Sequence, residues 1–204
     1  MFLRTESFND FLKLYPVIAF LTGLHILLWL IMDVFSFPFA VEWKQLGVGN
    51  NFLVSQGEYW RLLTPIFLHA GLSHTLFNSF TLVLFGPALE RMLGKVKFII
   101  AYLLAGIAGN IGTYAADPGA FYSHLGASGA IFGLFGIYAY MLFARKDLLD
   151  QASSQIIGVI IVLGLIMTFL QPNINVLGHL FGFIGGLALA PPLLKNIKPG
   201  FFFR

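Results

Sequence analysis

Long apolar stretches alternate with short polar segments along the whole chain. Six of these stretches approach the length that a helix needs to cross a bilayer, about 17 to 25 residues. They lie at 14–37, 68–89, 98–116, 127–144, 155–170 and 176–194. The fifth stretch is the shortest, and the fourth and sixth are rich in glycine. The pattern predicts an all-α, polytopic membrane protein built as a bundle of six transmembrane helices.

The composition also indicates a membrane protein. Of the 204 residues, 58% are hydrophobic and 10% are charged, whereas soluble domains carry about 25% charged residues. The chain has no cysteine, which excludes disulfides, thiolate metal sites and cysteine nucleophiles. Its net charge of +3 is small and no run of lysine and arginine occurs, so we expect no nucleic-acid partner.

The distribution of basic residues predicts how the helices are oriented. Lys44 and Arg61 fall on one side of the predicted spans. The other ten basic residues fall on the opposite side: Arg4, Lys13, Arg91, Lys95, Lys97, Arg145, Lys146, Lys195, Lys198 and Arg204. Because lysine and arginine are enriched in cytoplasmic loops, we expect a multi-pass protein of the cell membrane with both termini in the cytoplasm.

This orientation divides the chain into three parts. Residues 1–13 form a cytoplasmic N-terminal segment, residues 14–194 form the membrane domain and residues 195–204 form a cytoplasmic tail. The largest external loop covers about 38–67 and contains several aromatic residues, including Trp60. Aromatic side chains of this kind favour the membrane interface, so we expect this loop to lie partly in the headgroup layer.

Three polar side chains inside the spans lie at the same predicted depth. Ser128, His179 and His74 each stand 16 or 17 residues before the basic residue that follows their helix, which corresponds to about 25 Å. The hydrocarbon core is about 30 Å thick, so all three side chains lie just below the outer surface. Asn78 lies one turn deeper than His74 on the same helix face. Polar groups at such depths are costly unless they are partnered or functional.

Small residues surround two of these side chains. Gly126 and Gly129 flank Ser128, and Gly182 follows His179 by three residues in a series of glycines that recur every fourth position. Such spacing lets membrane helices approach backbone to backbone. If the two helices meet through these faces, Ser128 and His179 come within the reach of about 2.6–3.2 Å that a general base needs.

A hydroxyl and an imidazole at this distance predict nucleophilic catalysis by a serine–histidine dyad. Acidic residues are missing near this depth in both helices, so no carboxylate orients the imidazole. Ser128 begins its helix and can present its own backbone N–H to an oxyanion, with His74 and Asn78 as additional donors. Phe132, one turn after the serine, is the residue that we expect to hold the imidazole by packing.

Metal and cofactor chemistry is not predicted. Two histidines and backbone amides do not make a zinc site, which needs a carboxylate or a third imidazole in the same plane. The many phenylalanines are read as packing or lipid-facing surface rather than as a cofactor site.

The motifs together resemble the signature of the rhomboid intramembrane serine proteases. They are His74-x-x-x-Asn78, Gly126-Ala127-Ser128-Gly129 and Gly178-His179-x-x-Gly182. Tyr59-Trp60-Arg61, His69 and Glu90-Arg91 also look like the pattern of that family. The resemblance runs from about residue 56 to 190, and the chain looks like the minimal six-helix bacterial form.

The resemblance implies roles for individual residues. Ser128 would be the nucleophile and His179 the general base, with His74, Asn78 and the Ser128 amide forming the oxyanion hole. Trp60 and Arg61 would be structural and tie the external loop to the membrane interface, while Glu90 would help hold helix packing. The implied activity is that of a serine endopeptidase that cleaves peptide bonds in or near the transmembrane segments of membrane proteins. The oligomeric state is not predicted.

Two other classes of function stay open at this point. One is a catalytically silent rhomboid-like protein that binds client helices in the bilayer. The other is a small transporter or channel, although only Asp33 and Glu90 bring an acidic charge near the spans, both close to helix ends. Ser123 is the alternative nucleophile, but it lacks the glycine-lined setting of Ser128.

The remaining polar residues receive simpler interpretations. His69 counts out to the outer rim, where an interfacial or a catalytic role is equally compatible with its position. His25 is treated as structural, His124 lies in the loop before the serine, and Asn110 is expected to make a hydrogen bond between helices. The stretch 155–170, which contains Gly158 and Gly164, is a candidate gate that parts from 68–89 to admit a substrate from the side.

Overall fold

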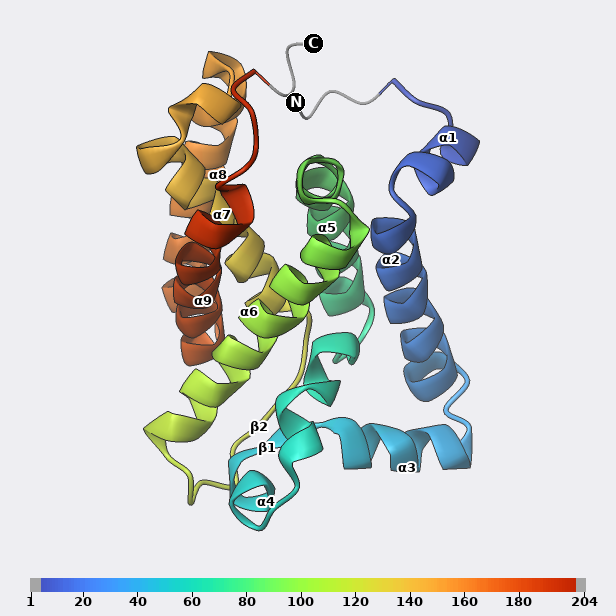
Figure 1. Cartoon of the computed structure of the whole chain (residues 1–204). Coiled ribbons are helices and arrows are strands. Elements are labelled where there is room, and N and C mark those ends of the chain that lie inside the picture. The colour runs from blue at the N-terminus through green and yellow to red at the C-terminus, as the bar shows by residue number, and fades with distance from the viewer. Residues whose placement is uncertain (1–4, 201–204) are drawn as a thin grey trace.

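A computed structural model describes residues 5–200, and in this range the protein is a bundle of helices with one pair of two-residue strands (Figure 1). Arg4 and Arg204, two of the basic residues behind the predicted orientation, lie outside the described residues. The same holds for the first four residues of the predicted N-terminal segment and the last four of the predicted tail.

The apolar stretches form the long helices of the bundle. They are α2 (Pro16–Trp29, continued by the π-helical η1, Leu30–Val34), α5 (Leu72–Leu93), α6 (Lys95–Ala116), α7 (Ser128–Ala144), α8 (Gln151–Leu170) and α9 (Val176–Leu194). Five helices of the described chain, all but α7, are long and apolar enough to cross a membrane. The all-helical membrane architecture is therefore confirmed. The count of six crossings stays a prediction, because α7 is apolar but has only 17 residues.

The fifth apolar stretch is longer than predicted. We expected a short helix over 155–170, but α8 begins at Gln151 and has 20 residues. Asp150 sets this start, since its side chain accepts a hydrogen bond of 2.7 Å from the backbone N–H of Ser153, as an N-cap residue does. The short apolar helix of the bundle is α7 instead.

The segment 38–67, predicted as an external loop, contains more secondary structure than expected. It holds α3 (Pro38–Gly47), β1 (Gly49–Asn50), α4 (Asn51–Ser55), η2 (Tyr59–Leu62) and η3 (Thr64–Phe67). Strand β1 pairs antiparallel with β2 (Ser123–His124), which places Gly49 opposite His124. Helix α3 lies across one end of the bundle (Figure 1), and its Phe39, Trp43 and Leu46 are exposed. These exposed apolar side chains fit the expected place of the loop in the headgroup layer.

Helices α7 and α9 pack backbone to backbone through glycine, as the spacing predicted. A Cβ atom at Gly182 would lie 2.1 Å from the carbonyl oxygen of Gly129, and one at Gly186 would lie 1.8 Å from that of Gly133. Helix α6 joins the same contact, because a Cβ at Gly109 would lie 2.5 Å from the carbonyl oxygen of Gly178. These contacts fix the first turns of α7 and α9 next to each other.

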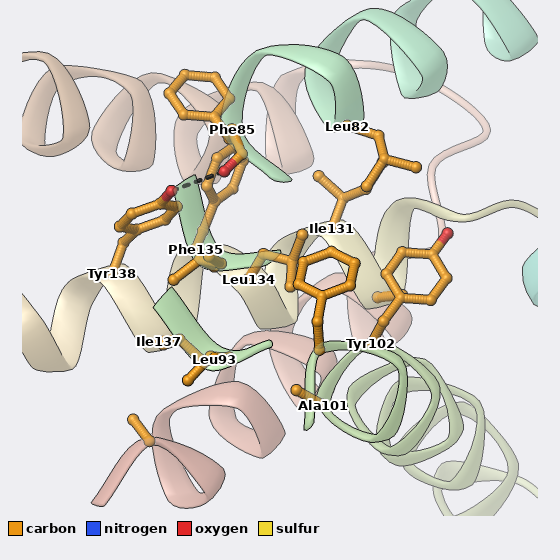
Figure 2. Packing of buried hydrophobic residues seen from close by; sticks show 14 of the residues in the cluster. Leu82, Phe85, Leu93, Ala101, Tyr102, Ile131, Leu134, Phe135, Ile137 and Tyr138 are labelled. Atoms are coloured by element: carbon orange, nitrogen blue, oxygen red, sulfur yellow. Dashed lines mark hydrogen bonds between the residues drawn. The ribbon is translucent and has the colours of Figure 1, made fainter. Parts of the chain in front are cut away.

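A buried apolar cluster connects α5, α6 and α7 (Figure 2). Leu82 and Phe85 of α5 face Ile131 and Phe135 of α7, and Tyr102 of α6 is fully buried beside them. The hydroxyl of Tyr138 donates a 2.6 Å hydrogen bond to the carbonyl oxygen of Phe85. The cluster therefore holds α5 against α7, the two helices that carry His74 and Ser128.

The two ends of the bundle differ in charge. The short helix α1 (Phe8–Leu14), the turn between α5 and α6, the 3-10 turn η4 (Lys146–Leu148) and the segment after α9 lie at one end, and α3 and α4 lie at the other (Figure 1). The first end carries most of the basic residues, including Arg91, Lys95 and Lys195. At this end the carboxylate of Glu90 accepts hydrogen bonds of 3.0 and 2.9 Å from the N–H groups of Val17 and Ile18. Glu90 thereby joins α5 to the start of α2.

Candidate active site

A cavity of about 260 Å³ lies toward the α3 end of the bundle. His74, Ser128 and His179, which come from the first turns of α5, α7 and α9, all line it. The wall is completed by residues at the end of α3, just before α5, in and around β2, and between α8 and α9: Val48, Ala70, Tyr122, Ser123, His124, Leu125, Asn173, Ile174 and Asn175. Several of these residues are exposed, so the cavity reaches the surface. The structure thus brings together three of the polar side chains that the sequence placed at one depth.

Ser128 is the first residue of α7. The N–H groups of a first helical turn have no carbonyl partner within the helix, and they stand at the positive end of the helix dipole. In the described part of the chain, the Ser128 hydroxyl has no hydrogen-bond partner and borders the cavity. The position therefore offers a free hydroxyl beside backbone donors that can stabilise negative charge.

His179 is held by contacts from three helices. Its own helix α9 is capped by Asn175, whose side chain accepts a 2.9 Å hydrogen bond from the N–H of Gly178. The imidazole stacks on the ring of Phe132 in α7, with centroids 4.1 Å apart and planes 15° apart. Its Nδ1 atom lies 2.9 Å from the hydroxyl oxygen of Thr168 in α8.

Ser128 and His179 share the cavity wall, but the described structure contains no direct hydrogen bond between them. In enzymes without substrate, catalytic hydrogen bonds are often long and tighten only in the complex. The absence of this bond from the described structure is therefore compatible with a serine–histidine pair.

His74 lines the same cavity and lies close to the backbone before the serine. Its Nδ1 accepts a 3.3 Å hydrogen bond from the N–H of Ala70, so the proton of the neutral ring lies on Nε2. A Cβ atom at Gly126 would lie 2.7 Å from this Nε2 and 3.7 Å from the Ser128 hydroxyl oxygen. Gly126 has φ of 132°, so both its backbone conformation and the space around it require glycine.

Asn78 is the predicted oxyanion donor that the structure does not bring to the cavity wall. It is buried, and its side-chain amide donates a 2.9 Å hydrogen bond to the carbonyl oxygen of His74 in its own helix. One of its two N–H groups is thus used within α5.

Trp60 and Arg61 connect η2 to the end of α3. Arg61 is buried, and its Nη1 donates to the carbonyl oxygens of Gln45 and Val48 at 2.9 and 2.6 Å. The indole N–H of Trp60 donates to the carbonyl oxygen of Leu46 at 3.1 Å. Its burial and its ion pair with Glu58 make Arg61 a structural support of this segment.

Asn110 and His25 each have a polar neighbour from another segment. Asn110 makes the predicted hydrogen bond between helices, since its amide donates to the carbonyl oxygen of Leu62 in the 3-10 helix η2 at 2.9 Å. His25 has a polar neighbour that the sequence did not indicate, because its ring lies 4.8 Å from that of His69, centroid to centroid. His69 in turn lies 5.1 Å from His74.

Ser123 and His124 belong to the short strand pair beside the cavity. The hydroxyl of Ser123 accepts a 3.0 Å hydrogen bond from the side-chain amide of Asn50. The ring of His124 lies over Gly49, where a Cβ atom would be 2.5 Å from its Nε2. Burial of the ring lowers the pKa of His124 to about 4. Ser123 and His124 therefore belong to the cavity wall and contact residues of β1.

Thr168 is the residue next to the site that the sequence did not single out. A lone threonine in an apolar helix usually bonds the carbonyl one turn back, so its type alone carries no signal. Its position near the C-terminal end of α8, at the predicted depth of His179, was the available indication.

Comparisons with known proteins agree with these motifs. A model of the Rhomboid domain matches residues 56–196. The chain is 50% identical over 192 residues to YdcA of Bacillus subtilis, whose name provisionally calls it a rhomboid protease. The aligned residues cover 93% of this chain and 94% of YdcA. It is 42% identical over 147 residues to rhomboid protease GluP of the same organism, with 72% of this chain and 28% of GluP covered. RHOMBOID-like protein 5 of Arabidopsis thaliana is 31% identical over 160 residues, which cover 78% of this chain and 52% of that protein.

Proposed function

The chain belongs to the rhomboid family, and from this premise we propose that it is an intramembrane serine protease in which Ser128 and His179 form the catalytic dyad. The observation that carries the proposal is the shared cavity. A serine with a free hydroxyl at the start of α7 and a firmly held imidazole at the start of α9 border the same space.

The first half of the reaction follows from this arrangement. Nε2 of His179 takes the proton of the Ser128 hydroxyl, and the serine oxygen attacks the scissile carbonyl carbon. The resulting oxyanion accepts hydrogen bonds from the N–H of Ser128 and from Nε2–H of His74, which is the proton-bearing nitrogen of that ring. His179 then gives the proton to the leaving amine, and the peptide bond breaks to leave an acyl-enzyme.

The second half needs water in the membrane-embedded site. A cavity of about 260 Å³ that reaches the surface supplies a path for it. His179 takes a proton from the water, whose oxygen attacks the acyl carbon. The bond between this carbon and the serine oxygen then breaks, and His179 returns the proton to the serine oxygen while the product leaves with a new carboxyl group. Asn78 adds a further donor to the oxyanion hole once its free N–H group turns toward the cavity.

The membrane setting defines the substrate class. The five candidate spans and the exposed apolar side chains support a site within reach of the bilayer. We therefore assign transmembrane segments of membrane proteins as substrates, cleaved in or near the bilayer. The protein itself takes the six-helix form in the cell membrane, with residues 1–13 and 195–204 in the cytoplasm. Substrates enter beside α8, the least buried of the candidate spans.

Labelling with a serine-directed fluorophosphonate tests the proposal without knowledge of the substrate. We expect the wild-type chain to be labelled and Ser128→Ala and His179→Ala to stay unlabelled. Ser123→Ala is the matched control, since this serine lines the same cavity but bonds Asn50. Labelling that persists in Ser128→Ala and disappears in Ser123→Ala would reject the assignment of the nucleophile.

A silent membrane-protein binder is the second candidate, favoured by the lack of a direct bond between Ser128 and His179 in the described structure. It predicts that Ser128→Ala keeps the cellular role of the protein. A transporter finds no such support. Among the described residues, the buried charged side chains are Arg61 and Glu90, and both are held by hydrogen bonds to the backbone.

A further inference from the structure

Thr168 in α8 stands between a backbone carbonyl and the candidate base. The side chain is 1% exposed. Its hydroxyl oxygen lies 2.9 Å from the carbonyl oxygen of Gly164, one turn back in the same helix, and 2.9 Å from Nδ1 of His179. Both partners are at hydrogen-bond distance, and the hydroxyl has a single proton to share between them.

Counting protons decides which way the bonds run. A carbonyl oxygen only accepts, so the Thr168 hydroxyl must donate to Gly164 for that contact to be a hydrogen bond. The hydroxyl oxygen then accepts from His179, whose Nδ1 must carry the proton. In the reverse arrangement the hydroxyl donates to Nδ1, and the contact with Gly164 is no longer a hydrogen bond. The first arrangement satisfies both contacts in a buried place where a lost bond is costly.

We propose that Thr168 is a positioning residue for the dyad, fixing His179 in the tautomer that has its proton on Nδ1 and its lone pair on Nε2. This inference rests on the proposed function of Ser128 and His179. Only this neutral tautomer lets Nε2 accept the serine proton. In serine–histidine–aspartate triads a buried carboxylate holds this tautomer, and here a neutral hydroxyl from a third helix does so.

The surroundings of Thr168 show how α8 contributes to the site. A Cβ atom at Gly164 would lie 3.5 Å from the edge of the Phe132 ring, so this ring packs between α8 and the imidazole of His179. One turn later Thr168 reaches the same imidazole at its Nδ1 edge. Helix α8 thus fixes both the plane and the protonated edge of the base, although it is the least buried of the candidate spans.

The test measures the tautomer directly and the reactivity of the serine separately. Nitrogen-15 NMR of histidine-labelled full-length protein, with His179→Gln to assign the signals, should show wild-type His179 protonated on Nδ1. Thr168→Val keeps the shape and removes the hydroxyl, so we expect a mixed tautomer and a fluorophosphonate labelling rate lowered about two- to tenfold, the worth of one neutral hydrogen bond. Thr168→Ser should restore both readouts.

Thr81→Val is the control, because the Thr81 hydroxyl makes the same bond one turn back, to the carbonyl oxygen of Phe77 at 2.8 Å, and contacts no histidine. It should leave the tautomer and the labelling rate unchanged. A wild-type ring protonated on Nε2 overturns the inference with no variant needed, as does a Thr168→Val protein with wild-type tautomer and rate. If the tautomer depends on Thr168 but Ser128→Ala is still labelled, the proposed function fails and the role of Thr168 in orienting the ring stands.

Discussion

The imidazole of His179 lies nearly flat on the ring of Phe132, with centroids 4.1 Å apart and an angle of 15° between the planes. The two residues come from different helices, α9 and α7, and Phe132 follows Ser128 by one turn. The ring that supports His179 is therefore carried by the same helix as Ser128. A shift of α7 would move Ser128 together with this ring.

Removing the ring of Phe132 should weaken catalysis more than folding. Phe132→Leu keeps an apolar side chain but loses the stacked face, which is worth about 0.5–1.5 kcal/mol in aromatic pairs. We expect the fluorophosphonate labelling rate to fall about two- to tenfold. Phe132→Tyr preserves the ring and should stay near the wild-type rate. Equal rates for the leucine and tyrosine variants would show that the ring does not orient His179.

A side chain at Gly126 should displace His74. In Gly126→Ala the new Cβ atom would lie 2.7 Å from Nε2 of His74, and φ of 132° is unfavourable for alanine. We expect a loss of stability of about 1–3 kcal/mol and a loss of labelling beyond what the lower stability explains. Gly57→Ala is the control, since Gly57 has φ of 100° but no atom within 4 Å of its Cβ position. If both variants label alike at matched folded fraction, His74 has no role in the reaction.

The sequence correctly predicted that polar residues from three separate spans lie together at one cavity. Ser128, His74 and His179 are recognisable because lipid tolerates few polar groups and because helix geometry converts residue counts into depth. The same geometry placed Asn78 near the serine. It does not predict that the side-chain amide of Asn78 donates a hydrogen bond to the carbonyl oxygen of His74 in its own helix. That bond depends on local contacts which no spacing encodes.

The errors at α8 have a different cause. The polar residues after Asp150 resemble a loop, so the predicted start of the helix fell four residues late, whereas the cap at Asp150 lets those residues form the first turn. The sequence did not predict a role for Thr168, because its partner His179 comes from another helix and no spacing along the chain relates the two residues. The external segment was predicted as a loop because its short helices have little stability alone and depend on supports such as Arg61.

The glycine contact between α7 and α9 should be essential for folding. In Gly182→Ala the added Cβ atom would lie 2.1 Å from the carbonyl oxygen of Gly129, and a backbone atom cannot give way without separating the helices. We expect a strongly lowered unfolding temperature in detergent and loss of labelling. Gly158→Ala in α8 is the matched control, because nothing lies within 4 Å of that Cβ position and alanine favours helices by about 1 kcal/mol over glycine. A stable, active Gly182→Ala protein would contradict the packing described for this pair.

The strand pair beside the cavity should make stability depend on pH through His124. Burial lowers the pKa of this histidine to about 4 in the folded protein, while an unfolded chain has a pKa of about 6.5. Between these two pKa values, His124 binds a proton in the unfolded state but not in the folded state. The free energy of unfolding therefore falls as the pH drops, by up to about 1.4 kcal/mol per pH unit, and becomes constant below pH 4. Above about pH 6.5 the residue has no effect. Unfolding of wild type and His124→Leu at pH 7, 5.5 and 4.5 measures this. As the pH drops, the free energy of unfolding of the wild type should fall relative to that of His124→Leu. If the two free energies change with pH in parallel, His124 is not buried in its neutral form.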